Sequence, residues 1–129
     1  MLSESFNIII IVIRLISKKT YRLSKEEIRS ICLLKDTHWK FGLKLQLSFF
    51  KKNIKSFDIH NILAVNNKII GYTLLRSRKM KTGLIKKYLL FDTLIIKKNH
   101  RNKKLSRLLM TFNNKIIKNN RKISFLMCN

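Results

Sequence analysis

The chain has 129 residues, 46% of them hydrophobic, which suits one packed domain and excludes a disordered tail. It carries 29 Lys and Arg against 6 Asp and Glu, a formal net charge of +23. Such a chain attracts polyanions such as nucleic acid, anionic lipid or phosphorylated cofactors. The basic residues are spread along the whole chain, however, and Lys, Asn and Ile share A/T-rich codons, so codon bias explains the charge as readily as a selected partner does.

The cysteines and histidines give no sign of a metal centre. Cys32 and Cys128 are too few and too far apart for a metal site or a disulfide framework, which favours a reducing, cytoplasmic location. His38, His60 and His100 show no spacing typical of metal ligands. The sequence therefore predicts a protein without a bound metal.

The first apolar run is Ile8–Ile16, which is too short for a membrane span of roughly 20 residues. Arg14 interrupts it, and the only charge before it is Glu4, whereas a signal peptide begins with basic residues. Its Ile and Val content predicts a buried strand. The alternative is a chain start that associates with a membrane.

Two helices are expected after this strand. Ser24 and Glu27 form a capping box, in which each side chain accepts a hydrogen bond from the backbone amide of the other. The first helix runs from there to about Lys35, and the second from His38 to about Asn53. Apolar residues recur at helical spacing in both: Ile28, Ile31 and Leu34 in the first, and Trp39, Leu43, Leu47, Phe50 and Ile54 in the second.

A hairpin is expected next. Its strands are Ile59–Val65 and Ile69–Arg76, and its tight turn lies at Asn66 and Asn67, because asparagine tolerates the left-handed backbone conformation. A basic connection, Met80–Lys87, follows the hairpin.

The last three predicted elements are a strand at Tyr88–Ile96, a helix from Lys103 and a strand at Ile123–Cys128. Strands and helices thus share one domain, with both hairpin and crossover connections, which predicts a mixed α/β sheet with helices on its faces. The helix has the clearest amphipathic pattern in the chain, formed by Leu105, Leu108, Leu109, Phe112 and Ile116.

The stretch from Leu90 to Met110 carries the chemistry. A strand passes through a short basic turn directly into a helix, where free amides and the helix dipole form an anion site. This arrangement predicts a pyrophosphate site, and the alternative is a solvated basic turn. The cations around it are Lys97, Lys98, Arg101, Lys103 and Lys104.

This stretch resembles the central motif of the GNAT N-acetyltransferases, which consists of a strand, a turn of the form Arg/Gln-x-x-Gly-x-Gly/Ala and a helix with Leu-Leu-Met-like residues. The turn here is Arg-Asn-Lys-Lys-Leu-Ser at residues 101–106, and Arg-Leu-Leu-Met follows at 107–110. The upstream order of elements also matches, including a hairpin that ends in Ile-Ile-Gly-Tyr at 69–72. The resemblance covers nearly the whole chain.

The resemblance implies an α/β, GNAT-like (acyl-CoA N-acyltransferase) fold over residues 1–129, with acetyl-CoA as the cosubstrate. The acidic residue that activates the amine in the family would be Asp92, because the carboxyl group lies on the strand before the turn. Burial would raise the pKa of this carboxyl and nearby lysines would lower it. The alternative for Asp92 is a structural residue at a bulge or beside a lysine. The backbone residues that would bind pantetheine are Leu94, Ile95 and Ile96, and those that would bind the pyrophosphate are Arg101, Asn102, Lys103, Lys104, Leu105 and Ser106.

Two departures from the family pattern bear on activity. Lys104 and Ser106 stand where the family has glycine or a small residue, although glycine lets backbone approach phosphate closely. The family also continues with a helix and further strands, and that helix often supplies a tyrosine that protonates the leaving thiolate, whereas the sequence ends at Asn129. The domain is therefore expected to be incomplete at its C-terminus, unstable and impaired as an enzyme.

The expected function is acetyl-CoA-dependent transfer of an acetyl group to an amine of an unidentified acceptor. The positive chain favours acidic or sugar-phosphate acceptors over basic ones. One alternative is a basic RNA- or ribosome-binding protein, although no aromatic residues are interleaved with basic ones in a stacking motif. The other is a non-catalytic remnant of a longer acetyltransferase gene.

Overall fold

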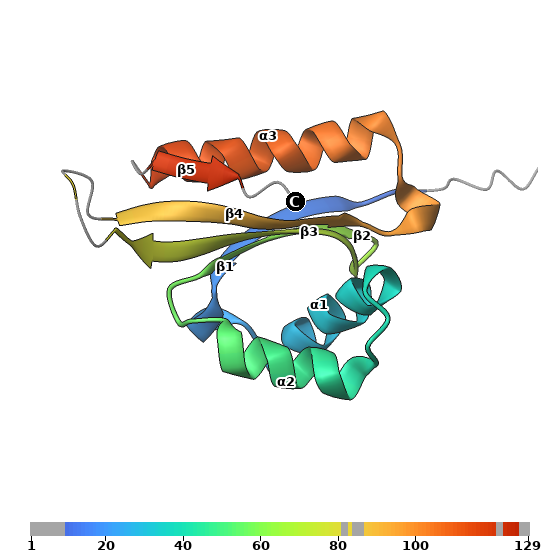
Figure 1. The fold of residues 1–129 in the computed structure, drawn as a ribbon. Coiled ribbons are helices and arrows are strands. Elements are labelled where there is room, and N and C mark those ends of the chain that lie inside the picture. Colours follow the sequence, from blue (N-terminus) through green and yellow to red (C-terminus); the bar gives the residue numbers. More distant parts are fainter. Residues whose placement is uncertain (1–9, 81–82, 84–86, 121–122, 127–129) are drawn as a thin grey trace, which may run out of the picture.

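The computed structural model describes residues 10–80, 83, 87–120 and 123–126. A five-stranded sheet lies at its centre, with two helices on one face and a third helix on the other (Figure 1). The elements are β1 (Ile13–Lys19), α1 (Lys25–His38), α2 (Leu43–Asn53), β2 (Ile59–Val65), β3 (Lys68–Lys79), β4 (Lys87–Ile96), α3 (Lys103–Asn119) and β5 (Ile123–Leu126), with single 3₁₀ turns η1 (Thr20–Arg22) and η2 (Lys98–His100).

The strands lie in the sheet in the same order as in the sequence. β1 to β4 pair antiparallel, and β5 pairs parallel to β4 after the chain crosses over through α3. A parallel neighbour requires such a crossover, because a hairpin can only reverse the chain. The mixed α/β sheet that the order of elements predicts is therefore confirmed.

The predicted strand at Ile8–Ile16 is wrong in its bounds, because β1 spans Ile13–Lys19. Ile8 and Ile9 lie outside the described residues, and the exposed residues 10–12 precede the strand. β1 is an edge strand, so its length depends on its one partner, β2. Ile13 lies opposite Val65, the last residue of β2, and the apolar run before Ile13 has no strand residue to pair with.

The capping box at the start of α1 is confirmed. The Glu27 amide donates to Ser24 Oγ at 3.1 Å, and the Ser24 amide donates to the Glu27 carboxylate at 2.9 Å. The predicted start of the second helix at His38 is wrong, because α1 itself continues to that residue and α2 begins at Leu43. Gly42 separates the helices with a φ of 87°, a left-handed conformation that helical periodicity does not reveal.

The β2–β3 hairpin turns at Asn66 and Asn67, whose φ values of 51° and 66° confirm the expected left-handed turn. β2 has the predicted bounds, whereas β3 continues past Arg76 to Lys79. The longer strand shortens the predicted connection at Met80–Lys87, of which residues 81–82 and 84–86 lie outside the described residues.

The sheet has an apolar core on each face. On the α1/α2 face, Ile31 and Phe50 pack over Tyr72 and Leu74. On the α3 face the helix comes close to the sheet at Gly71, where a Cβ atom would lie 3.1 Å from Leu63 Cβ and 3.2 Å from Leu109 Cδ2. The absence of a side chain at Gly71 therefore lets α3 approach β3.

His60 is buried within the α1/α2-face core. Its ring stacks between Phe50 and Tyr72, its Nδ1 lies 2.6 Å from the Tyr72 hydroxyl, and its Nε2 lies 2.7 Å from Thr20 Oγ1. Burial, and secondarily the charge of Lys35, lower the pKa of His60 from 6.5 to about 3. A neutral imidazole on β2 therefore links the turn η1 to β3.

This burial predicts acid sensitivity. The unfolded chain takes up a proton on His60 below pH 6.5, but the folded chain does so only near pH 3. The free energy of unfolding is therefore unaffected by His60 above pH 6.5 and decreases as the pH falls below this value. Urea unfolding should show a loss of about 2 kcal/mol between pH 7 and pH 5 from this residue. His60→Gln should remove this slope, whereas His38→Gln, at an exposed position, should keep it. An unchanged slope in His60→Gln would contradict the assignment.

Candidate active site

β4 contains one residue more than the β3 segment opposite it. Leu74 lies opposite Thr93 and Leu75 lies opposite Phe91, so Asp92 is the extra residue of a β-bulge. The bulge changes which face each side chain reaches. Phe91 packs into the core beneath α3, whereas Asp92 and Thr93 both line a cavity on the opposite face.

Among the described residues, the pairing between β4 and β5 reaches only as far as this bulge. β5 covers β4 only from Tyr88 to Phe91, and no described residue pairs with that edge from Asp92 to Ile96. The open edge includes the predicted pantetheine-binding residues Leu94, Ile95 and Ile96. A strand edge without a partner presents amides and carbonyls that an extended ligand can pair with.

The open edge leads to the basic turn before α3. The Lys97 amide donates to the Ile70 carbonyl at 2.7 Å, and Arg101 Nε donates to the Ile96 carbonyl at 3.0 Å. Asn102 caps the helix by accepting from the Leu105 amide at 2.9 Å. The turn is thus held against the end of the sheet by its own backbone and side chains.

The predicted pyrophosphate-binding amides fall into two groups. The amides of Arg101, Leu105 and Ser106 already donate within the turn and helix. Those of Asn102, Lys103 and Lys104 have no acceptor among the described residues, and they lie at the positive end of the α3 dipole. The Lys103 and Lys104 side chains are exposed, so three free amides and two lysine ammonium groups lie together in a cluster at the start of α3.

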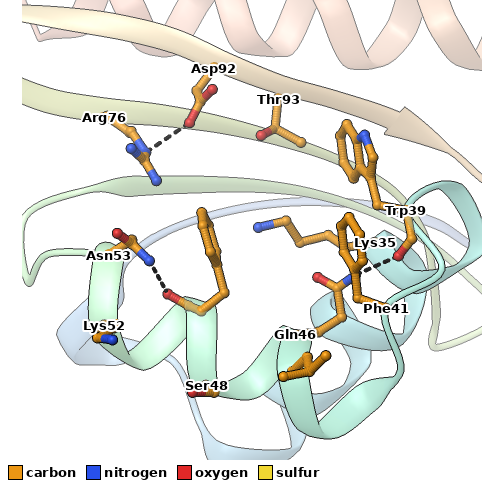
Figure 2. Close-up of a pocket in the computed structure, with 12 residues that line it drawn as sticks. Lys35, Trp39, Phe41, Gln46, Ser48, Lys52, Asn53, Arg76, Asp92 and Thr93 are labelled. Carbon is orange, nitrogen blue, oxygen red and sulfur yellow. Dashed lines mark hydrogen bonds and ion pairs between the residues drawn. The ribbon is translucent and has the colours of Figure 1, made fainter.

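A cavity of about 560 Å³ lies between α2 and the sheet beside the bulge (Figure 2). On its sheet side, Arg76 Nε lies 2.8 Å from Asp92 Oδ2 in an ion pair, with the two side chains 17% and 33% exposed. Asp92 is thus both a bulge residue and a partner of an arginine, rather than of the lysine that the sequence offered as an alternative. The residues that line the cavity are Lys35, Trp39, Phe41, Leu45, Gln46, Ser48, Phe49, Lys52, Asn53, Arg76, Asp92 and Thr93.

Lys35 is the least expected residue of this cavity. It is 6% exposed, and its amine reaches into the space between α2 and the sheet (Figure 2). The ammonium lies 5.7 Å from the centroid of the Phe49 ring, and no acceptor of a hydrogen bond from it is found in the described part of the chain. Burial lowers the pKa of Lys35, against smaller opposing effects from Cys32 and Asp92.

Sequence reasoning missed this cavity, although one signal for it was present. Lys35 lies three and four residues after Cys32 and Ile31, and seven after Ile28, so it occupies the buried stripe of α1. A lysine on an apolar stripe indicates a charge held inside the protein. The sequence could not show which aromatic residues of α2 would surround it, because that depends on how the two helices pack.

Two general properties complete the description. Within the described ranges, no helix is long and apolar enough to span a membrane. The same part of the chain holds no group of three or more His, Cys, Asp and Glu residues that could bind a metal ion.

The buried charge of Lys35 should reduce folding stability. Replacing it in Lys35→Met keeps an unbranched chain of similar size and should raise the free energy of unfolding at neutral pH by about 1 kcal/mol or more. The gain should shrink as the pH rises through 10.5, because above that pH the amine is neutral in both states. Urea unfolding measures it, and Lys44→Met, at an exposed position on α2, should stay within about 0.5 kcal/mol of the parent. A destabilised Lys35→Met would show that the charge supports the fold.

No protein-family model matches the chain, and no curated protein sequence matches it. Solved structures do match it in shape. An aminoglycoside N-acetyltransferase in complex with CoA superposes with a TM-score of 0.69 at 8% identity, covering 100% of this chain and 82% of that one. A GNAT family acetyltransferase from Staphylococcus aureus gives 0.64 at 17% identity, covering 92% and 86%.

A ribosomal-protein-alanine N-acetyltransferase from Brucella melitensis superposes similarly, with a TM-score of 0.63 at 9% identity over 92% of this chain and 81% of that one. At these identities the comparison bears on the fold alone. Together with the sheet order and the crossover through α3, it shows that the chain has the fold of the GNAT acetyltransferases.

Proposed function

We propose that the protein is an acetyl-CoA-dependent N-acetyltransferase that transfers an acetyl group to an amine. The observation that carries the proposal is the open edge of β4, which runs from the bulge at Asp92 to the N-terminus of α3. A long ligand with amide groups in its middle and a pyrophosphate at one end suits this path. The fold is shared with an acetyltransferase solved with CoA.

The proposed cofactor contacts follow this path. The backbone of Leu94, Ile95 and Ile96 would pair with the pantetheine amides along the open edge. The free amides at Asn102, Lys103 and Lys104 would bind the pyrophosphate, and the exposed lysines would add charge–charge attraction. Lys104 has a side chain where the resemblance suggests glycine, but that side chain is exposed, so it adds a cation rather than filling the site.

The proposed chemistry takes place at the bulge. A neutral amine in the cavity attacks the thioester carbonyl, a C–N bond forms, the C–S bond breaks, and CoA leaves as the thiol with the proton that the amine loses. Asp92 would accept this proton first, directly or through water, while Arg76 holds the carboxylate in place. Amides of β4 beside the bulge would polarise the carbonyl. We also propose a reducing, cytoplasmic location, since Cys32 is a buried free thiol.

Binding of CoA provides the first test. Calorimetry should give a micromolar or weaker Kd that weakens further with salt, because exposed charges at the cluster are screened. Lys104→Gln should weaken binding about two- to fivefold at low salt. Lys115→Gln changes the same residue type at an exposed position three turns along α3, and it should leave the Kd unchanged. No heat at millimolar CoA, with tight binding of RNA instead, would favour the RNA-binding alternative.

Turnover provides the second test. Release of the CoA thiol, followed colorimetrically with a panel of small amines, should depend on Asp92. Asp92→Asn keeps the shape of the side chain but removes the proton acceptor, and kcat should fall by about 10²–10⁴-fold. Glu26→Gln, at an exposed position in the first turn of α1, should leave kcat unchanged. If CoA binds and no amine is acetylated, the protein is a non-catalytic relative of these enzymes.

A further inference from the structure

We propose that the cavity beside the bulge takes an acceptor that carries a carboxylate on an apolar, aromatic-sized body, and that Lys35 is the residue that recognises this carboxylate. That the ligand is an amine rests on the proposed function. The requirement for a carboxylate rests on the charges and the shape of the cavity alone.

The first argument is the state of Lys35. A buried ammonium is costly unless hydrogen bonds and an opposite charge compensate for it. Lys35 is 6% exposed, its one described contact for the charge is the face of Phe49, and no carboxylate of the described chain lies within ion-pair distance. A ligand carboxylate in the cavity would supply the missing acceptor.

The second argument is that no neighbouring group can take this role. Asp92, the one carboxylate among the described residues that line the cavity, is already paired with Arg76 at 2.8 Å. Cys32 lies beside Lys35 within the core, and burial raises the pKa of its thiol, so it stays neutral. His60 is neutral above about pH 3. None of these groups forms an ion pair with the Lys35 ammonium, and Asp92 attracts it only from a longer range.

The third argument is the overall charge of the cavity. Among the described residues that line the cavity, Lys35, Lys52 and Arg76 face a single carboxylate, that of Asp92, so positive charge is in excess. A polycationic amine would meet repulsion in such a site, whereas an amine that also bears a carboxylate would not. The net charge of the whole chain, +23, acts in the same direction.

The fourth argument concerns the rest of the ligand. Trp39, Phe41, Leu45 and Phe49 give the cavity an apolar wall on the helix side, and each is more than one-third exposed. Figure 2 shows Asp92 and Thr93 on the opposite, sheet side. A volume of about 560 Å³ suits a small molecule. The amine would lie toward Asp92, the carboxylate at Lys35 and the apolar body against the aromatic side chains.

The experiment compares two probes that differ by one group. L-Phenylalanine and 2-phenylethylamine have the same ring and the same amine, but only the amino acid has a carboxylate. Calorimetry with the full chain, without acetyl-CoA, should show L-phenylalanine binding at least about tenfold more tightly, because a charge-assisted hydrogen bond forms in a buried site. 3-Phenylpropionate, which has the carboxylate but no amine, should bind more tightly than 3-phenylpropan-1-ol.

Variants connect this preference to Lys35. Lys35→Met and Lys35→Gln should both abolish the preference for the carboxylate, and Lys44→Met should retain it. Because Lys35→Met is expected to be more stable than the parent, loss of binding in that variant would not reflect unfolding. Equal binding of the paired probes, no binding of either at millimolar concentration, or an unchanged preference in both Lys35 variants would overturn the proposal.

Failure of the proposed function would look different. If L-phenylalanine binds through Lys35 but no acetyl group is transferred from acetyl-CoA, the carboxylate site stands and the enzymatic proposal fails. If amines are acetylated but 2-phenylethylamine binds and reacts as well as L-phenylalanine, the enzymatic proposal stands and the carboxylate site is wrong.

Discussion

The extra residue at Asp92 is the constraint on which the candidate site depends. A regular strand places alternate side chains on opposite faces, so without the bulge Phe91 and Thr93 would share a face. With it, Phe91 closes the core under α3 while Asp92 and Thr93 face the cavity. The described pairing with β5 reaches the same point, and no described residue pairs with the edge from there toward α3. One irregularity therefore directs an acid into the cavity beside the edge of β4 that no described residue pairs with.

Charge in this protein has two different physical consequences. In the first turn of α3, Lys103 and Lys104 are exposed, so their charges cost little and add to the field at the helix N-terminus. In the cavity, Lys35 is 6% exposed, so its charge is largely desolvated and reduces folding stability unless a ligand supplies an opposite charge. The codon-bias explanation for the high lysine content applies well to exposed positions. It does not account for a lysine on the buried stripe of α1, where an apolar residue would pack at no electrostatic cost.

Where the sequence predicted the fold well, the signal was local. Ser24 and Glu27 cap a helix within one turn of chain, Asn66 and Asn67 adopt a turn that few other residues tolerate, and the helix predicted from Lys103 begins there. Where the prediction of an element's bounds was wrong, as for β1, the bound depends on a residue that is distant in the sequence. The start of β1 depends on where β2 ends opposite it, so the apolar content of residues 8–12 could not locate it.

The sequence by itself determined the class of fold, the order of its elements, and a basic turn that leads into a helix, because hydrophobic periodicity, capping and turn chemistry act between residues that are close in the chain. Only the tertiary structure decided that β4 bulges at Asp92, that no described residue pairs with its edge beyond Phe91, and that Arg76 and Lys35 meet at one cavity. These features join residues from α1, β3 and β4. Their charges and distances arise when the helices pack against the sheet, which no local pattern encodes.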